Sequence, residues 1–207
     1  MAGEKSYDAE SIKVLEGLEG VRKRPALFIG NTGKEGLHHL IYEAVDNSVD
    51  EALGGYCKEI KVLINSDGSA TIEDDGRGIP VDIHAQFKIP ACEVALTKLH
   101  AGGKFDKDSY VISGGLHGVG ISCVNALAKK LILTIKRDGN IYEQEYSRGD
   151  AKTKLKIVGK CEKNETGTKI TFWPDEEIFS TLNFDYKILE TRFREIAFLN
   201  AGLKIIL

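Results

Sequence analysis

The longest stretch of helical periodicity in this chain covers residues 36–53. Apolar residues recur there at intervals of three and four, the spacing that gathers side chains on one face of an α-helix. They are Leu37, Leu40, Ile41, Ala44, Val45, Val49, Ala52 and Leu53. Gly54 and Gly55 follow directly and provide a helix stop. The pattern therefore predicts an amphipathic helix.

Most of the remaining chain alternates between short strand-like runs and turns. Two pairs of runs flank turns rich in Asn, Asp and Gly, as β-hairpins do, and they cover residues 60–64 with 70–73 and 131–137 with 141–146. Further strands are expected at 155–158, 169–173 and 202–207, and further helices at 92–100, 119–130 and 185–199. Strands outnumber helices and are mostly hairpin-linked. We therefore expect an α+β fold, a two-layer sandwich of a mixed, mainly antiparallel sheet with helices on one face.

Composition places the chain among ordinary globular proteins. Hydrophobic residues make up 42% of it, enough apolar material for a core. The formal net charge of −3 supplies no global positive field for nucleic acid or an acidic membrane. No apolar run approaches the ~20 residues that span a bilayer, and no signal peptide opens the chain, so no membrane partner is expected. The four cysteines form no CxxC pair, which favours reduced thiols and a cytoplasmic location.

The predicted helix at 36–53 carries a second, polar face. His39, Glu43 and Asn47 are spaced four residues apart and so stack one turn above another. A carboxylate in this position can take a proton from water, and an amide oxygen can bind Mg²⁺, a hard cation. On this feature alone, an ordinary solvated helix face is the simpler interpretation.

An acidic, glycine-rich turn, residues 74–80 (DDGRGIP), ends the second predicted strand. Period-two alternation puts Asp74 on the same face as Ala70 and Ile72. A carboxylate that closes an apolar face can accept a hydrogen bond from an adenine amino group, and the glycines let the backbone approach a flat ring. A simple Asp-Gly turn explains the segment equally well on its own.

Two further glycine-rich segments, 100–105 (HAGGKF) and 113–120 (SGGLHGVG), lead into the helical pattern at 119–130. Exposed backbone N–H groups and a helix N-terminus favour anions, and Lys104 adds a positive charge. Glycines are costly to order, so this density favours a mobile lid over phosphates rather than a flexible hairpin loop. Downstream, Thr168 enters a strand after Gly167 and could turn its hydroxyl inward, although threonine is common in strands.

Motifs of several other nucleotide-binding folds are absent from the sequence. There is no G-x-x-x-x-G-K-[ST] loop, no G-x-G-x-x-G fingerprint and no set of protein-kinase motifs. An ATPase built from these residues therefore belongs to another design.

Taken in order, the E-x-x-x-N helix, the D-x-G-x-G turn, the glycine lid and the G-T strand entry resemble the GHKL-type ATPase fold. That family includes type II topoisomerases, heat-shock chaperones, mismatch-repair ATPases and sensor histidine kinases. The resemblance is strongest to the gyrase B branch and covers residues 14–25, 42–53, 74–80, 100–105 and 114–120. It implies that residues 1–207 form a single ATP-binding domain and that residues 1–20 form an arm that crosses to a partner subunit.

The resemblance implies a role for each candidate residue. Glu43 is the general base, His39 supports it, and Asn47 binds Mg²⁺. Asp74 binds the adenine amino group, directly and through a water shared with Thr168. The other nucleotide-binding candidates are Arg77, Gly78, Ile79, Pro80, Gly102, Gly103, Lys104, Tyr110, Leu116, His117, Gly118, Val119, Gly120 and Arg137. Of these, Arg77, Pro80 and Arg137 would border the pocket that binds aminocoumarin inhibitors in this family.

The resemblance also implies cofactors and partners. ATP and Mg²⁺ are the expected cofactors. A complete protein of this branch would dimerise on binding ATP and act with the gyrase A subunit on DNA, driving strand passage and negative supercoiling. The family's ATPase needs a lysine from a following transducer domain, which these 207 residues do not include, so we expect weak turnover from this chain alone. One departure, Ala26-Leu27-Phe28 in place of Gly-Met-Tyr, removes a hydroxyl near the arm.

Three alternatives fit part of the sequence. The equivalent domain of topoisomerase IV shares every ATP motif, although the amino-terminal run and residues 198–200 favour the gyrase branch. A histidine-kinase module needs no water-activating glutamate at position 43. A nucleotide sensor would bind ATP without turnover, and a turnover assay with Glu43→Ala as a control separates it from an enzyme.

Overall fold

The computed structural model describes residues 17–101 and 120–207. The predictions for the arm before residue 17 and for the glycine-rich residues 102–119 lie outside this part of the chain.

The described residues form one eight-stranded sheet in the order β5-β4-β3-β7-β2-β1-β8, with β6 paired to β4. The strands are β1 (Glu59–Ile64), β2 (Ala70–Asp74), β3 (Ala128–Arg137), β4 (Asn140–Ser147), β5 (Asp150–Ala151), β6 (Lys156–Lys160), β7 (Gly167–Pro174) and β8 (Lys204–Ile206). Neighbouring strands are antiparallel except β1 and β8, which are parallel. The predicted mixed, mainly antiparallel sheet is therefore confirmed.

The central strand β7 joins the two predicted hairpins into one sheet. It pairs with β2 on one side, where Thr168 lies opposite Asp74, and with β3 on the other, where Thr168 lies opposite Ile135. Thr168 thus lies between Asp74 of β2 and Ile135 of β3 in the sheet.

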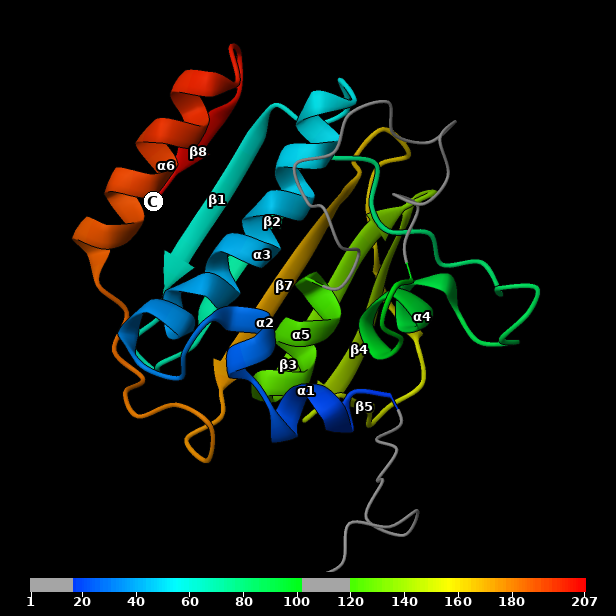
Figure 1. Ribbon diagram of the computed structural model, residues 1–207. Coiled ribbons are helices and arrows are strands. Elements are labelled where there is room, and N and C mark those ends of the chain that lie inside the picture. The colour runs from blue at the N-terminus through cyan, green and yellow to red at the C-terminus, as the bar shows by residue number, and fades with distance from the viewer. Residues whose placement is uncertain (1–16, 102–119) are drawn as a thin grey trace, which may run out of the picture.

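The helices are α1 (Glu19–Lys23), α2 (Ala26–Ile29), α3 (Lys34–Leu53), α4 (Ala91–Thr97), α5 (Gly120–Leu127) and α6 (Tyr186–Leu199). Figure 1 shows α3, α4 and α5 across the same face of the sheet, as the fold prediction requires. Apolar residues of α3, among them Leu40 and Ile41, pack there with inward-facing strand residues such as Ile72 and Phe172 to form the core. Along β7, outward-facing residues remain partly exposed, which is the alternation expected of a half-covered sheet.

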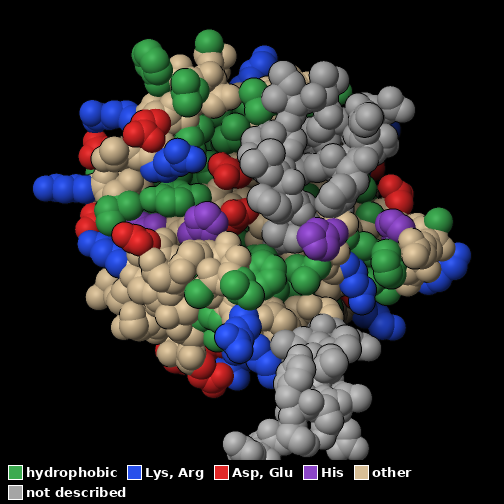
Figure 2. Space-filling view, viewed as in Figure 1, with side chains coloured by type: hydrophobic (Ala, Val, Ile, Leu, Met, Phe, Trp, Pro, Cys, Tyr) green, Lys and Arg blue, Asp and Glu red, His purple; other side chains and the backbone are tan. Residues whose placement is uncertain are grey.

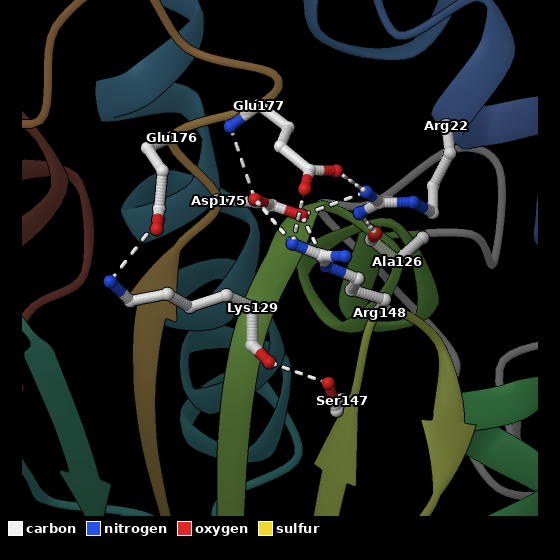
Figure 3. Close-up of polar contacts among 8 residues, drawn as sticks. All are labelled: Arg22, Ala126, Lys129, Ser147, Arg148, Asp175, Glu176 and Glu177. Carbon is white, nitrogen blue, oxygen red and sulfur yellow. Dashed lines mark hydrogen bonds and ion pairs between the residues drawn. The ribbon is translucent and has the colours of Figure 1, made fainter.

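One predicted helix is too long, because the helix expected at 119–130 ends at Leu127 and β3 begins at Ala128. A helix that continued to Lys130 would use the carbonyl of Ala126 for its last hydrogen bond, and the carbonyls after it would need partners outside the helix. Instead Arg22 Nη1 donates to Ala126 O, and the backbone N–H groups of Asp175 and Arg148 donate to Leu127 O and Ala128 O. Figure 3 shows Arg22, Arg148 and Asp175 gathered at this junction. Tertiary contacts therefore turn the chain directly from helix into strand.

The other differences are at short elements. The helix expected at 92–100 ends at Thr97, and neither α1, α2 nor β5 is foreseen by the sequence pattern. Each of these three elements has five residues or fewer, too few to show a period. The strand expected in the final run is present as β8.

Candidate active site

Three predicted site residues lie on one side of α3. His39 Nε2 is 2.9 Å from Glu43 Oε1, and Asn47 Nδ2 donates to the backbone oxygen of Glu43 at 3.0 Å. All three residues are partly exposed. The one-turn stacking predicted from their spacing is therefore present. Figure 2 shows histidine and acidic side chains side by side near the middle of this face of the molecule.

The pair His39–Glu43 is suited to proton transfer. The hydrogen bond with Glu43 raises the pKa of His39 above its usual value, although burial acts in the opposite direction. The negative charges of Glu43 and Asp46 raise this pKa further, and Arg192 on α6 lowers it. A protonated His39 donates to Glu43, which keeps that carboxylate oriented as a base must be.

The helix α5 begins directly against the Glu43 carboxylate. Its first residue is Gly120, and a side-chain carbon built there would overlap Glu43 Oε2. A larger residue at position 120 would push the Glu43 carboxylate out of this position. The first N–H groups of a helix have no partner within it and attract anions. A candidate base and an anion-attracting helix end therefore meet at one place.

Asp74 ends β2 with its carboxyl group turned toward α3. Ser48 Oγ donates to Oδ2 at 2.7 Å, and the backbone N–H groups of Gly76 and Thr168 donate to Oδ1 at 3.0 and 3.2 Å. The predicted orientation of Asp74, on the apolar face of its strand, is confirmed by the contact with α3.

The environment of Asp74 is unusual for a carboxylate. Burial raises the pKa of Asp74 above its usual range, and the three hydrogen bonds, that of Ser48 first among them, only partly counteract this effect. The nearby charge of Glu51 raises the pKa further. All three donors are neutral, so the carboxylate charge is solvated by hydrogen bonds and has no cationic partner among them. A group of this kind in a protein is a candidate for ligand binding.

The turn that follows Asp74 is fixed from two sides. Arg137 Nη1 donates to the backbone oxygens of Arg77 and Gly78 at 3.2 and 2.8 Å. The Arg77 guanidinium binds both carboxylate oxygens of Glu51, at 3.0 and 2.8 Å, and lies 3.8 Å from the centre of the Tyr56 ring. Gly78 has a φ of 75° and touches the backbone of β3, which only glycine tolerates readily.

Thr168 connects this turn to the centre of the sheet. Its hydroxyl oxygen accepts a hydrogen bond from Ile79 N at 3.3 Å, while its own N–H binds Asp74. Thr168 is buried and Ile79 half-buried, whereas Pro80 is exposed at the margin.

The described candidates thus form two groups that share α3. One contains His39, Glu43, Asn47 and Gly120, and the other contains Asp74, Arg77, Gly78, Ile79, Arg137 and Thr168, with Pro80 at its edge. Asn47 of the first group is followed in the helix by Ser48, which binds the second, so the two groups are adjacent. The remaining candidates, Gly102, Gly103, Lys104, Tyr110, Leu116, His117, Gly118 and Val119, lie outside the described residues.

Sequence reasoning overlooked two residues of this arrangement. Ser48 falls on the apolar stripe of α3, and a polar residue on a buried helix face is a recognisable signal. Glu51 continues the four-residue series of His39, Glu43 and Asn47, so the same spacing argument could have included it.

The far end of α5 is held by charged residues, which we call the Asp175 cluster: Arg22, Arg148, Asp175 and Glu177 (Figure 3). Asp175 Oδ2 lies 2.7 Å from Arg22 Nη2 and 2.9 Å from Arg148 Nε. Burial by itself would raise the pKa of Asp175, but the hydrogen bond from Glu177 N and the two arginines outweigh it and lower the pKa. This cluster therefore fixes the helix whose other end meets Glu43.

Asn125 adds a second anchor for α5. It is fully buried, and its Nδ2 donates to Leu96 O of α4 at 2.9 Å and to Gly149 O at 3.1 Å. The helices α4 and α5, which flank residues 102–119 in the sequence, are thereby joined by one side chain.

Comparison with known proteins places this geometry in a family. The model of the Histidine kinase-, DNA gyrase B-, and HSP90-like ATPase family matches residues 32–178. The chain belongs to this family. That stretch includes α3, the turn after Asp74, α5 and Thr168.

Within the family, the similar proteins are DNA gyrase B subunits. The chain is 57% identical over 201 residues to the DNA gyrase B protein of Helicobacter pylori strain 26695, covering 97% of this chain and 26% of that protein. It is 61% identical over 199 residues to the DNA gyrase B protein of Thermotoga maritima, covering 96% and 31%. The chain thus spans about a quarter to a third of the length of these relatives.

A solved structure agrees with the sequence relatives. The 43K ATPase domain of Thermus thermophilus gyrase B, in complex with an aminocoumarin, superposes with a TM-score of 0.81 at 47% identity, covering 91% of this chain and 47% of that one. The fold is therefore that of the gyrase B ATPase domain. The comparisons favour this assignment over the topoisomerase IV equivalent. Within residues 17–101 and 120–207, no helix is both long and apolar enough to cross a bilayer.

Proposed function

We propose that Glu43 is the general base with which this domain hydrolyses ATP. The observation that carries the proposal is the contact of Glu43 with both His39 and the first residue of α5. Water that attacks a phosphoryl group must lose a proton, and a positioned carboxylate is suited to accept it. His39 supports the base by directing a proton on Nε2 toward it.

At the opposite end of the site, Asp74 receives adenine. The adenine amino group donates to Oδ2, and a water shared with Thr168 completes the contact. The border of the pocket around the adenine ring is formed by Arg77, Gly78, Ile79, Pro80 and Arg137. The aminocoumarin in the complex of the Thermus thermophilus domain suggests that inhibitors of this class bind here too.

The phosphates lie at the amino end of α5. The first turn of α5, which begins at Gly120, offers backbone N–H groups. The nucleotide would be wrapped by Gly102, Gly103, Lys104, Tyr110, Leu116, His117, Gly118 and Val119. Charge on the phosphates develops during transfer, and donors fixed in advance stabilise it.

Asn47 would hold Mg²⁺ through its amide oxygen. The amide nitrogen Nδ2 donates to Glu43 O, so Oδ1 is the atom that would bind the ion. Mg²⁺ commonly takes only one or two protein oxygens and completes its shell with water and phosphate. No cluster of three His, Cys, Asp or Glu residues forms a separate metal site in residues 17–101 and 120–207. When bound, the ion would neutralise charge on the phosphates.

For the longer protein, the gyrase B relatives suggest ATP-driven DNA strand passage with negative supercoiling. The expected partners are the gyrase A subunit, DNA and a second gyrase B chain joined on ATP binding through an arm formed by residues 1–20. The single-domain boundary at 1–207 and a cytoplasmic location belong to the same proposal. Turnover by these 207 residues alone should be weak, because they do not include the transducer lysine that the family's ATPase uses. The loss of one cation at a transition state typically lowers the rate by a factor of about 10²–10³.

The decisive experiment compares Glu43→Gln with the unmodified protein in the intact subunit. We expect calorimetry to show unchanged binding of a nonhydrolysable ATP analogue and phosphate release to fall by about 10²-fold or more. Near-normal turnover in the variant would remove Glu43 as the base. Binding without turnover in the unmodified subunit would instead favour the nucleotide sensor.

A further inference from the structure

Ser48 is a buried polar residue on the apolar stripe of α3. It is only 2% exposed, and its hydroxyl donates to Asp74 Oδ2 at 2.7 Å. Alanine has a higher helix propensity and would suit the apolar neighbours better. The contribution of the Ser48 hydroxyl is therefore its hydrogen bond to Asp74.

The hydrogen bonds of Asp74 can be counted. An ionised carboxylate offers about four lone-pair positions, two on each oxygen. Two donors, Gly76 N and Thr168 N, occupy Oδ1, and Ser48 occupies one position on Oδ2. One acceptor position on Oδ2 remains among the described contacts. A ligand must bring a donor to this position, because an acceptor would face the lone pair of a buried charge.

We propose that Ser48 is a positioning residue that sets the base selectivity of the nucleotide site. Its hydroxyl keeps Asp74 an ionised hydrogen-bond acceptor. An acceptor selects a purine with an amino group at C6, as in adenine, over one with an oxygen at C6, as in guanine. The inference rests on the proposed binding of adenine at Asp74. Guanine presents an oxygen where adenine presents its amino group, so an acceptor at Asp74 rejects it.

Loss of the hydroxyl would change the chemistry of Asp74. The Ser48 hydrogen bond is the largest of those that lower the pKa of Asp74, so Ser48→Ala should raise that pKa further. A protonated Asp74 carries an O–H donor and can bind the oxygen of an oxo-purine. The other titratable groups nearby are Glu51 on α3, Asp75 and Arg77 in the turn, and Cys57 ahead of β1. Glu51 and Arg77 are already paired with each other.

The test uses the full chain with Ser48→Ala and a matched control, Ser69→Ala. Ser69 is equally buried, and its hydroxyl also donates to an aspartate, Asp67 Oδ1, at 2.7 Å. It lies in the turn between β1 and β2, away from Asp74. Calorimetry with nonhydrolysable analogues of ATP and GTP between pH 5 and 8 gives the ratio of the two affinities. Titration of the phosphates affects both analogues alike and cancels in this ratio.

We expect Ser48→Ala to lower the ATP-to-GTP affinity ratio by about tenfold near neutral pH. The pH at which selectivity is half lost should also move upward. Ser69→Ala should leave both quantities unchanged. Equal weakening of both analogues by Ser48→Ala, with no movement of the pH midpoint, would overturn the role of Ser48. Absence of selectivity in the unmodified chain would instead overturn the assignment of Asp74 to adenine.

Discussion

Two aspartates at strand ends of the same sheet have opposite surroundings. Asp74 ends β2 and receives hydrogen bonds from one hydroxyl and two backbone amides, all neutral. Asp175 follows β7 and is paired with the guanidinium groups of Arg22 and Arg148. As a result burial dominates at Asp74 and raises its pKa, while the hydrogen bonds and cations dominate at Asp175 and lower its pKa.

The difference is the one expected between a carboxylate that binds a ligand, as proposed for Asp74, and a structural one. A buried carboxylate that is paired with cations stabilises the fold, because removing one partner leaves the other charge buried and uncompensated. A charge held by neutral donors is strained by burial and gains from a further donor. The Asp175 cluster therefore anchors α5, whereas the surroundings of Asp74 fit the ligand-binding role proposed for it.

The largest effect should follow from removing the charge of Asp175. In Asp175→Asn, two arginines would face a neutral amide, and Arg22 is mostly buried. Breaking a buried pair on one side costs about 3–5 kcal/mol of unfolding free energy. Urea denaturation measures this loss. A change below about 1 kcal/mol would mean that the arginines are solvated elsewhere and that the comparison fails.

The same substitution at Asp74 should spare the fold and damage binding. In Asp74→Asn, the amide can turn an N–H toward the adenine amino group, and affinity for ATP should fall by about 2–4 kcal/mol. Calorimetry measures the affinity, and urea denaturation should show stability equal to or above that of the unmodified chain. Loss of stability comparable with that of Asp175→Asn would make Asp74 a structural residue.

Acid should affect the two sites with opposite sign. Because the pKa of Asp175 is lowered by folding, its ionised carboxylate stabilises the folded state at pH values above the pKa of the unfolded chain, about 3.9. This contribution is lost as pH falls through the folded pKa. Because the pKa of Asp74 is raised by folding, its protonated form stabilises the folded state at pH values below about 3.9, the pKa of the unfolded chain. This contribution is lost as pH rises through the folded pKa. The loss of unfolding free energy in Asp175→Asn should therefore be smaller in acid than at neutral pH. Any gain of unfolding free energy in Asp74→Asn should be smaller in acid as well. Unfolding free energies at a series of pH values test both trends.

The smallest effect is expected at a third carboxylate, Glu51. Its pair with Arg77 resembles the contacts of Asp175 in chemistry but is more exposed: the side chains of Glu51 and Arg77 are 15% and 38% exposed, against 0% and 19% for Asp175 and Arg22. Solvent reaches the Arg77 guanidinium and screens the pair, and exposed pairs contribute about 0–1 kcal/mol, so Glu51→Gln should shift the urea midpoint less than Asp175→Asn does. A loss as large as that of Asp175→Asn would show that pairing alone, without burial, explains the difference between the sites.

The sequence was sufficient wherever one periodic element carried the information. The apolar spacing of residues 36–53 predicted α3, and the four-residue spacing on its polar face predicted the stacking of His39, Glu43 and Asn47. Period-two alternation predicted the direction of the Asp74 side chain, because strand geometry alone determines it.

Only the tertiary structure decided the relations between elements. The contact of Gly120 with Glu43, the place of Thr168 beside Asp74 and the Ser48 hydrogen bond join residues 26 to 94 positions apart. The end of α5 at Leu127 depends on Arg22, Arg148 and Asp175, which lie before and after it in the chain. Local propensity ends where a backbone carbonyl finds a better donor elsewhere, and the location of that donor is a property of the folded chain.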